Sequence, residues 1–289
     1  MALILPAYAK LNLTLDVIGR RPSGYHDIDS VMQTISLHDL LSVEPTDCRV
    51  FDVVGPAIDG ENLVLKAARE LEAMAGRALP FTIRLYKRIP MGAGLGGGSS
   101  DAAALLNAAN QLYDLRLNHR DLAEVAAQVG QDVPFFLRGG TARATGLGST
   151  ISPLPSVPPS WYFLVVCPPV QVLTRTVYEA VGGSEKSARR TPRCVDLLEA
   201  PTPTLPRKQG RENESTQAVF GNDLEAVSRR LFPAFDEAVD QLLSVVPSLT
   251  MSGTGAAMFA VFGDRRQAKA ALAAIKPFRY PAWLCRSVA

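Results

Sequence analysis

The feature that most constrains this 289-residue chain is a glycine-rich stretch at residues 90–104, Pro-Met-Gly-Ala-Gly-Leu-Gly-Gly-Gly-Ser-Ser-Asp-Ala-Ala-Ala. It follows a strand-like run, residues 81–86, and leads directly into an apolar helical run. Glycine lets several backbone N–H groups converge on one oxyanion, and the helix that follows points its positive end at the same place. The sequence therefore predicts an anion site built from backbone, with a phosphate as its natural ligand.

Two common kinds of glycine loop do not fit this stretch. A P-loop requires a lysine directly after its last glycine, and none follows here. Gly92, Gly94 and Gly97 match the dinucleotide pattern Gly-x-Gly-x-x-Gly, but Pro90 interrupts the connection from the strand, and the acid expected about 20 residues on would be Asp114. A flexible linker is not favoured either, because linkers are not normally placed between a strand and an apolar helix.

The composition is that of a soluble enzyme with one large or two modest domains. Hydrophobic residues make up 47% and charged residues 20% of the chain, and the formal net charge is +2. The small net charge predicts neither a nucleic-acid nor a membrane partner. We expect a small-molecule substrate and a monomer or weak homodimer, although composition does not determine the oligomeric state. Four widely separated cysteines, three histidines and the lack of a leader-like or membrane-spanning run favour a reduced, cytoplasmic protein.

Hydrophobic periodicity predicts a mixture of strands and helices in the first half of the chain. Residues 11–17 alternate apolar and polar side chains, which puts Lys10 and Asn12 on the polar face of a strand. Further strands are predicted at 32–36, 41–44, 50–54 and 81–86, and helices at 62–75, 101–113 and 120–129.

A proline-rich segment, residues 152–160, predicts a domain junction because four prolines in nine residues suit neither a helix nor a central strand. We therefore expect one domain at 1–155 and another at 156–289. The second should contain strands at 162–167, 257–262 and 283–288 and helices at 224–231, 235–245 and 265–275. The polar composition of residues 184–216 predicts a mobile surface excursion.

Several side chains outside the glycine stretch suit phosphoryl transfer, which needs a phosphate cradle, usually Mg²⁺, and a group that orients or deprotonates the attacking oxygen. Asp132 is the candidate base and Lys10 its candidate cationic partner. Taken alone, Asp132 could equally be an ordinary turn residue and Lys10 a solvated lysine on a strand. Tyr25 and His26 could stack on and hydrogen-bond a base or sugar, or could simply belong to a capped turn. Residues 251–257 form a second small-residue loop, which favours a shared phosphate site.

Three stretches in chain order, residues 6–13, 90–104 and 251–256, resemble the three motifs of the GHMP small-molecule kinases. Within that superfamily, residues 10–26, 94–103 and 132–142 resemble the kinases that act on 4-diphosphocytidyl-2-C-methyl-D-erythritol. The resemblance covers most of the chain.

The resemblance implies an α+β, two-domain GHMP kinase fold. Its N-terminal domain would contain a left-handed βαβ crossover, an arrangement that composition cannot predict because such crossovers are normally right-handed, and its C-terminal domain would be ferredoxin-like. The implied activity is phosphorylation of the substrate's 2-hydroxyl in the non-mevalonate isoprenoid pathway, with ATP and Mg²⁺ as cofactors.

The same resemblance implies a role for individual residues. Asp132 would be the catalytic base and contact the substrate, and Lys10 would be its partner; the metal ligands stay unassigned. The ATP phosphates would be bound by Pro90, Gly92, Gly94, Leu95, Gly96, Gly97, Gly98, Ser99 and Ser100. The substrate would be bound by Asn12, Tyr25, His26, Tyr178, Gly253 and Thr254, with Tyr25, His26 and Tyr178 as a cytosine clamp.

The chain departs from the family pattern in three places. Gln131 stands where a small residue commonly precedes the base, Ser149 stands where a glutamate is common, and residues 184–216 look longer than usual. The alternatives are a kinase of homoserine or of a mevalonate-type alcohol, and a nucleotide-binding regulator without catalysis. Lys10 and Asp132 argue against the regulator.

Overall fold

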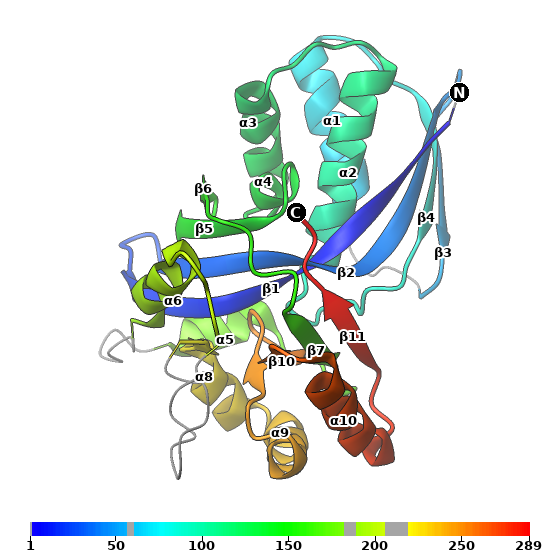
Figure 1. Ribbon diagram of the computed structural model, residues 1–289. Coiled ribbons are helices and arrows are strands. Elements are labelled where there is room, and N and C mark those ends of the chain that lie inside the picture. Colours follow the sequence, from blue (N-terminus) through cyan, green and yellow to red (C-terminus); the bar gives the residue numbers. More distant parts are fainter. Residues whose placement is uncertain (1, 57–60, 182–188, 206–218) are drawn as a thin grey trace. The chain divides into compact units, whose positions relative to one another are not determined.

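The computed structural model describes residues 2–56, 61–181, 189–205 and 219–289. The chain forms two compact units, each assembled from several segments (Figure 1). The first unit consists of Met1–Ala9, Leu37–Met91 and Gly96–Gly139, and the second of Lys10–Ser36, Gly92–Leu95 and Gly140–Ala289. Two long strands, β1 (Leu3–Arg20) and β2 (His26–Pro45), contribute residues to both units. The linear domain boundary between residues 155 and 156 stays a prediction.

The first unit contains a βαβ crossover. Strand β3 (Val50–Val54) pairs in parallel with β4 (Phe81–Tyr86), and helix α1 (Leu63–Ala75) lies between them in sequence. Helix α1 begins where the Asn62 side chain accepts a hydrogen bond from the Val64 N–H at 2.8 Å, and ends at Gly76, whose φ of 65° is left-handed. The handedness of the crossover stays a prediction.

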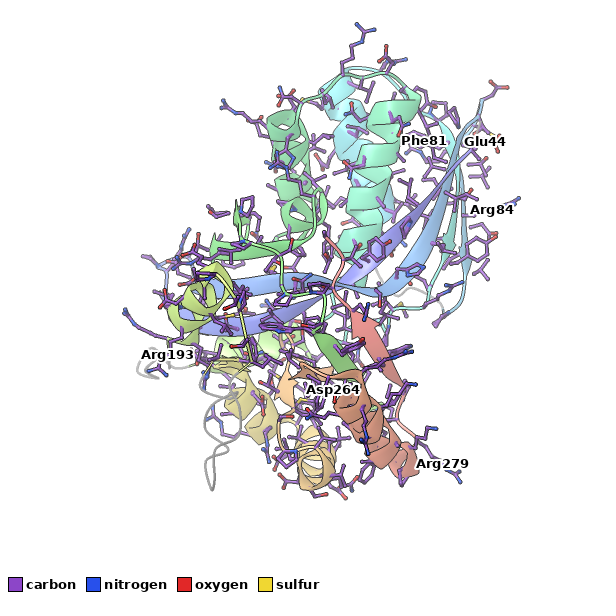
Figure 2. The ribbon with its side chains drawn as sticks, in the orientation of Figure 1. Glu44, Phe81, Arg84, Arg193, Asp264 and Arg279 are labelled. Atoms are coloured by element: carbon purple, nitrogen blue, oxygen red, sulfur yellow. The ribbon has the colours of Figure 1, made fainter. Side chains whose placement is uncertain are left out.

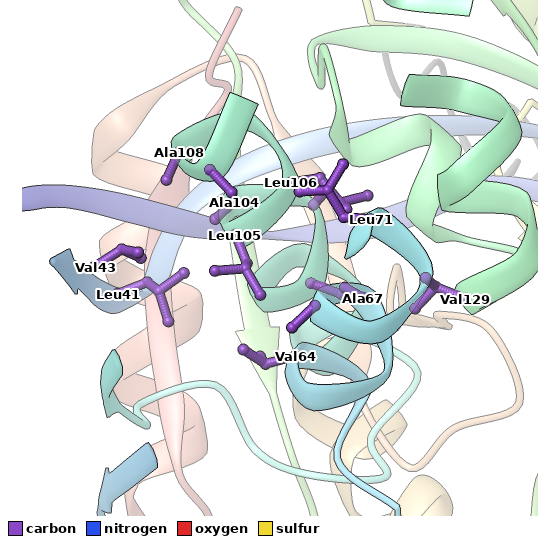
Figure 3. Packing of buried hydrophobic residues seen from close by; sticks show 14 of the residues in the cluster. Leu41, Val43, Val64, Ala67, Leu71, Ala104, Leu105, Leu106, Ala108 and Val129 are labelled. Atoms are coloured by element: carbon purple, nitrogen blue, oxygen red, sulfur yellow. The ribbon is translucent and has the colours of Figure 1, made fainter. Parts of the chain in front are cut away.

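The core of the first unit lies between its strands and helices. Strand β4 pairs antiparallel with the end of β2, and its side chains alternate, so that Phe81 points into the core and Arg84 away from it (Figure 2). Helices α2 (Gly97–Leu112) and α3 (His119–Val129) pack against α1, and the short α4 (Val133–Phe136) packs against both α2 and α3. Alanines let the helices pack closely, while leucines and valines fill the space; Figure 3 labels Leu41, Val43, Val64, Ala67, Leu71, Ala104, Leu105, Leu106, Ala108 and Val129.

The second unit contains a four-stranded antiparallel sheet in the order β11-β7-β10-β9. Its strands are β7 (Tyr162–Val166), β9 (Thr250–Met251), β10 (Met258–Phe262) and β11 (Ala282–Arg286). Numbered along the chain, the strands lie in the order 4-1-3-2, with helices between the first and second and between the third and fourth. This is the ferredoxin-like arrangement, as the resemblance implied.

The described part of the second unit contains the helices α5 (Thr174–Ala180), α6 (Arg190–Glu199), α8 (Leu224–Leu231), α9 (Pro233–Val245) and α10 (Arg265–Ile275), and a 3₁₀ turn, Lys276–Phe278, follows α10. Helix α10 packs on β7, β10 and β11 and touches α9. Strand β5 (Thr141–Gly146) pairs with β2 and with β6 (Thr150–Pro153), and β8 (Gly221–Asn222) pairs in parallel with β1. Within the described residues, no helix combines the length and the apolar character that crossing a membrane requires.

The structure differs from the predicted mobile excursion at 184–216. Residues 190–199 form helix α6, and Thr191, Cys194 and Leu198 in it are buried. The cause is a distant cap, because the buried Asp16 carboxylate on β1 accepts hydrogen bonds from the N–H groups of Arg190 at 3.0 Å and Thr191 at 2.8 Å. Residues 184–188 and 206–216 of the excursion lie outside the described residues. The strands predicted at 32–36 and 41–44 are parts of one strand, β2.

Candidate functional site

The first glycine loop, residues 90–100, adopts a backbone that only glycine accepts easily. Gly92, Gly94 and Gly96 have φ values of 64°, 75° and 70°. Gly96 occupies the N-cap position of α2 and has no side chain to cap it, so the N–H groups of the first helical turn are left for another acceptor. This is the geometry expected of an oxyanion site at a helix N-terminus.

A second glycine loop, residues 251–256, packs directly against the first within the second unit. The Ala257 N–H donates to the Ala93 carbonyl at 3.1 Å, and the Ser252 hydroxyl donates to the Gly94 carbonyl at 3.2 Å. Space is so short that a Cβ on Gly94 would lie 2.1 Å from the Ser252 carbonyl oxygen. The two small-residue loops that the sequence predicted to share a site are therefore neighbours.

Strand β1 brings Lys10 and Asn12 to the same two loops. The Lys10 N–H donates to the Leu95 carbonyl at 2.9 Å, and the Asn12 N–H donates to the Ser252 hydroxyl at 3.1 Å. Both side chains are buried, and the Lys10 ammonium donates a hydrogen bond to the side-chain amide oxygen of Asn12. The amide nitrogen of Asn12 in turn donates to the Ser30 hydroxyl at 2.8 Å. Burial of a lysine on a strand indicates a role beyond solvation.

In the first unit, a buried ionic cluster that the sequence analysis missed holds both ends of the first glycine loop. The Lys87 ammonium contacts the carboxylates of Asp39 and, at 2.8 Å, of Asp101 in α2. Asp39 also accepts a hydrogen bond from the Ile89 N–H at 2.8 Å. A Cβ on Gly97 would lie 3.3 Å from the Lys87 ammonium. We call Lys87, Asp39 and Asp101 the Lys87 cluster.

The Lys87 cluster holds two carboxylates on one ammonium. Burial raises the pKa of Asp101 to about 7 despite the attraction of Lys87, and the neighbouring Asp39 carboxylate adds to the rise. The pKa of Lys87 is raised because attraction by the two carboxylates outweighs its burial. One oxygen of Asp101 has no hydrogen-bond partner among the described residues.

Asp132, the predicted base, lies in the first unit at the N-cap position of α4, the short helix that packs against α2. It is half-buried, and its side chain makes no capping hydrogen bond to the backbone of α4. The preceding residue, Gln131, is exposed. The sequence placed Asp132 in a turn after a helix, and the structure confirms that position.

In the second unit, two of the three predicted clamp rings lie side by side. The ring centroids of His26 and Tyr178 are 5.7 Å apart, with 34° between the ring planes, and Tyr25 is 64% exposed. His26 begins β2 after a turn in which the Arg21 N–H donates to the Tyr25 carbonyl at 2.7 Å. Neither ring nitrogen of the buried His26 has a hydrogen-bond partner among the described residues. Burial lowers the pKa of His26, and the charge on Arg20 lowers it further; the nearby Val181 backbone, which does not reach hydrogen-bond geometry with the ring, raises it by less.

The second unit thus contains Lys10, Asn12, the clamp residues, the centre of the first glycine loop and the second glycine loop, including Gly253 and Thr254. The Thr254 hydroxyl lies 2.9 Å from that of Thr174. The first unit contains Pro90, the helix start Gly96–Ser100 and Asp132. Among the described residues, no group of three or more His, Cys, Asp or Glu side chains is arranged to hold a metal ion.

Comparison with known proteins first defines the class. The family of GHMP kinase N-terminal domains matches residues 62–140, and that of GHMP kinase C-terminal domains matches residues 198–282. Homoserine kinase from Cytophaga hutchinsonii has the same fold, with a TM-score of 0.72 over 99% of this chain and 95% of that one at 18% identity. The chain is therefore a GHMP kinase, and the predicted two-domain fold is confirmed.

Closer relatives define the family. The 4-diphosphocytidyl-2-C-methyl-D-erythritol kinase of Carboxydothermus hydrogenoformans is 36% identical over 92% of this chain and 91% of its own length. The corresponding kinase of Aromatoleum aromaticum is 38% identical over 98% of this chain and 92% of its own length. A crystal structure of 4-(cytidine 5'-diphospho)-2C-methyl-D-erythritol kinase is 33% identical, with a TM-score of 0.78 over 99% of this chain and 100% of that one. The chain belongs to the 4-diphosphocytidyl-2-C-methyl-D-erythritol kinase family.

Proposed function

We propose that this kinase transfers the γ-phosphoryl group of ATP to the 2-hydroxyl of 4-diphosphocytidyl-2-C-methyl-D-erythritol, a step in isoprenoid precursor synthesis. The observation that carries the proposal is the contact of the two glycine loops beside Lys10 and Asn12. Together with the family membership, this contact supports a phosphate site next to a site for an alcohol.

In the proposed step, the 2-hydroxyl oxygen bonds to the γ-phosphorus while the bond from that phosphorus to the bridging oxygen of ADP breaks. Asp132 accepts the hydroxyl proton, and Lys10 stabilises the negative charge that develops on the attacking oxygen. Asn12 supports this role of Lys10, since its amide oxygen accepts a hydrogen bond from the ammonium and fixes its direction.

The first glycine loop would bind the ATP phosphates through backbone N–H groups at the start of α2, from Gly96 to Ser99, since the Ser100 N–H already donates to the Gly96 carbonyl at 2.9 Å. When bound, Mg²⁺ would neutralise charge on the transferred phosphoryl group. The lack of an all-protein metal cluster among the described residues suits this ion, which proteins usually hold through substrate phosphates and only one or two carboxylates.

The alcohol substrate would be selected by its cytosine. Tyr25 and Tyr178 would stack on the base, and His26 would supply polar contacts through its side chain or backbone. A neutral imidazole with no partner among the described residues suits this role, because it has both a donor and an acceptor to offer. A homoserine or mevalonate-type substrate has no ring for such a clamp. A cytoplasmic location and a monomer or weak homodimer stay predictions.

Phosphorus NMR of the reaction product tests the proposal. Incubation of the protein with ATP, Mg²⁺ and the cytidyl substrate should yield ADP and one new phosphomonoester, coupled to the carbon that carries the 2-hydroxyl. A phosphate on another hydroxyl, or release of inorganic phosphate alone, would exclude the proposed reaction.

A further inference from the structure

A five-residue segment, Gly221–Glu225, connects strand β1 to the second glycine loop. Gly221 and Asn222 form β8 and pair with Thr14 and Leu15 of β1, the strand that also carries Lys10 and Asn12. The Asp223 N–H donates to the Leu15 carbonyl at 2.9 Å, and the Asp223 carboxylate accepts from the Val17 N–H at 3.0 Å. The segment is therefore fixed to β1 by backbone and side chain.

The Asn222 side chain uses all of its hydrogen-bonding groups on backbone. Its amide nitrogen donates to the carbonyls of Met251 at 3.0 Å and Gly253 at 2.6 Å, and its oxygen accepts from the Leu224 N–H at 2.9 Å. Both donor hydrogens of the amide are committed to the second glycine loop, and the residue is buried. Asn222 therefore has no donor left for a ligand and acts through the loop.

Glu225, in the first turn of α8, binds the same loop. Its carboxylate accepts hydrogen bonds from the Met251 N–H at 2.9 Å and from the Thr250 hydroxyl at 3.1 Å. Met251 is thus bound at its carbonyl by Asn222 and at its N–H by Glu225.

The bond from Asn222 to the Gly253 carbonyl also sets the direction of the next N–H. In a trans peptide the carbonyl and the N–H of the following residue point to opposite sides. Fixing the Gly253 carbonyl toward Asn222 therefore turns the Thr254 N–H away from it. Gly253 packs against Gly94, because a Cβ on Gly253 would lie 3.1 Å from the Gly94 Cα.

We propose that Asn222 is a positioning residue that fixes the backbone of the second glycine loop against the first, with Glu225 as its support. The role in phosphate binding rests on the proposed function. The positioning itself rests on the hydrogen bonds of Asn222 and Glu225 and can be measured without turnover.

The variant Asn222→Asp tests this role, because aspartate keeps the acceptor for the Leu224 N–H but loses both donors to the loop. The matched control is Asn110→Asp, because the Asn110 amide likewise donates to a loop carbonyl, that of Leu117, at 3.0 Å, and accepts from the Leu117 N–H at 3.0 Å. Asn110 belongs to α2 in the first unit and contacts neither glycine loop in these hydrogen bonds.

Two readouts are measured: hydrogen exchange of the Gly255 and Ala257 amides, which bond within the second glycine loop and to Ala93, and the Kd of ATP by calorimetry. In Asn222→Asp we expect hydrogen exchange of both amides to accelerate about tenfold or more, while exchange along β7 stays unchanged. The Kd of ATP should rise about tenfold, because the loop loses two hydrogen bonds. In Asn222→Asp, the Kd of the cytidyl substrate should not change. In the control Asn110→Asp, neither the exchange of these two amides nor the Kd of ATP should change.

Unchanged amide exchange, or an equal rise of Kd for ATP and the cytidyl substrate, would overturn the proposal. If Asn222→Asp does not fold, Asn222→Ser is measured in its place, because it keeps a small hydrogen-bonding side chain. Should the wild type bind ATP but fail to phosphorylate the cytidyl substrate, the proposed function fails, while the exchange and ATP affinity still test the positioning.

Discussion

Asp132 and Lys10 are the two side chains to which we assign the chemical step. An aspartate at an N-cap usually accepts a hydrogen bond from the helix backbone, but the Asp132 side chain does not cap α4. A strand lysine usually extends into solvent, but Lys10 is only 4% exposed and is held by Asn12. Both departures suit groups positioned for a reaction.

Replacing Asp132 by alanine should lower kcat by about 10²–10⁴-fold, the usual contribution of general-base catalysis, because the substrate hydroxyl loses its proton acceptor. The Kd of ATP, measured by calorimetry, should stay the same, since the base acts on the nucleophile. The exposed neighbour gives the control Gln131→Ala, which should keep its kcat. Near-normal turnover of folded Asp132→Ala would remove Asp132 from this role.

His26 should titrate below its ordinary pKa of 6.5, because burial and the charge on Arg20 both disfavour the imidazolium. The pKa is measured by following the His26 imidazole resonance by NMR as the pH is changed. This resonance is assigned as the one that disappears in the variant His26→Gln. As the pH falls below about 6.5, this histidine binds a proton in the unfolded chain before it does so in the folded protein. Protonation of His26 should therefore reduce the free energy of unfolding in this pH range. A midpoint at or above 6.5 would contradict this environment.

The two glycine loops act as one element because their backbones touch. The contact makes Gly94 much less tolerant of a side chain than Gly92. Gly92 and Gly94 both have left-handed φ values, 64° and 75°, so either substitution by alanine carries a similar conformational cost of about 1 kcal/mol. A Cβ on Gly92 meets nothing within 4 Å, whereas a Cβ on Gly94 would overlap the Ser252 carbonyl.

We therefore expect Gly94→Ala to abolish detectable ATP binding and Gly92→Ala to weaken it only slightly. Calorimetric titration of both variants with ATP measures the difference, and circular dichroism checks that both are folded. Equal affinities in the two variants would show that the contact between the loops does not shape the nucleotide site.

The Lys87 cluster should be a major determinant of stability at the start of α2. Lys87→Met leaves the Asp39 and Asp101 carboxylates buried with no cation between them, so the free energy of unfolding should fall by about 3–5 kcal/mol. Urea denaturation measures this quantity, and Arg84→Met on the exposed face of β4 is the control. A change as small as that of the control would show that the cluster is not important for stability.

At the scale of the whole molecule, the sequence predicts elements whose signal is local. Strand β4 alternates buried and exposed side chains, and α1 has a capping asparagine at one end and a glycine at the other, so both appear in the sequence where the structure has them. The glycine loops were predictable for the same reason, since glycines followed directly by a helix form a local pattern.

Elements that depend on distant partners were not predictable. Helix α6 looks polar and mobile in sequence, but its cap, Asp16, lies 174 residues away from Arg190. Strand β2 looks interrupted at Asp39, which is buried because the Lys87 ammonium and the backbone N–H groups of Arg88 and Ile89 bind its carboxylate. The two-residue strand β8 has no periodicity, so the positioning role of Asn222 shows only in the folded chain.

The most direct test of the central claim is a panel of kcat/KM values, measured by ADP release, with four alcohols as substrates. The panel consists of 4-diphosphocytidyl-2-C-methyl-D-erythritol, 2-C-methyl-D-erythritol 4-phosphate, homoserine and mevalonate. Base–aromatic stacking contributes roughly 1–3 kcal/mol per base, so the cytidyl compound should exceed the compound without cytosine at least about tenfold, and homoserine and mevalonate should give no turnover. Equal values with and without cytosine, or preferred turnover of homoserine or mevalonate, would contradict the assignment.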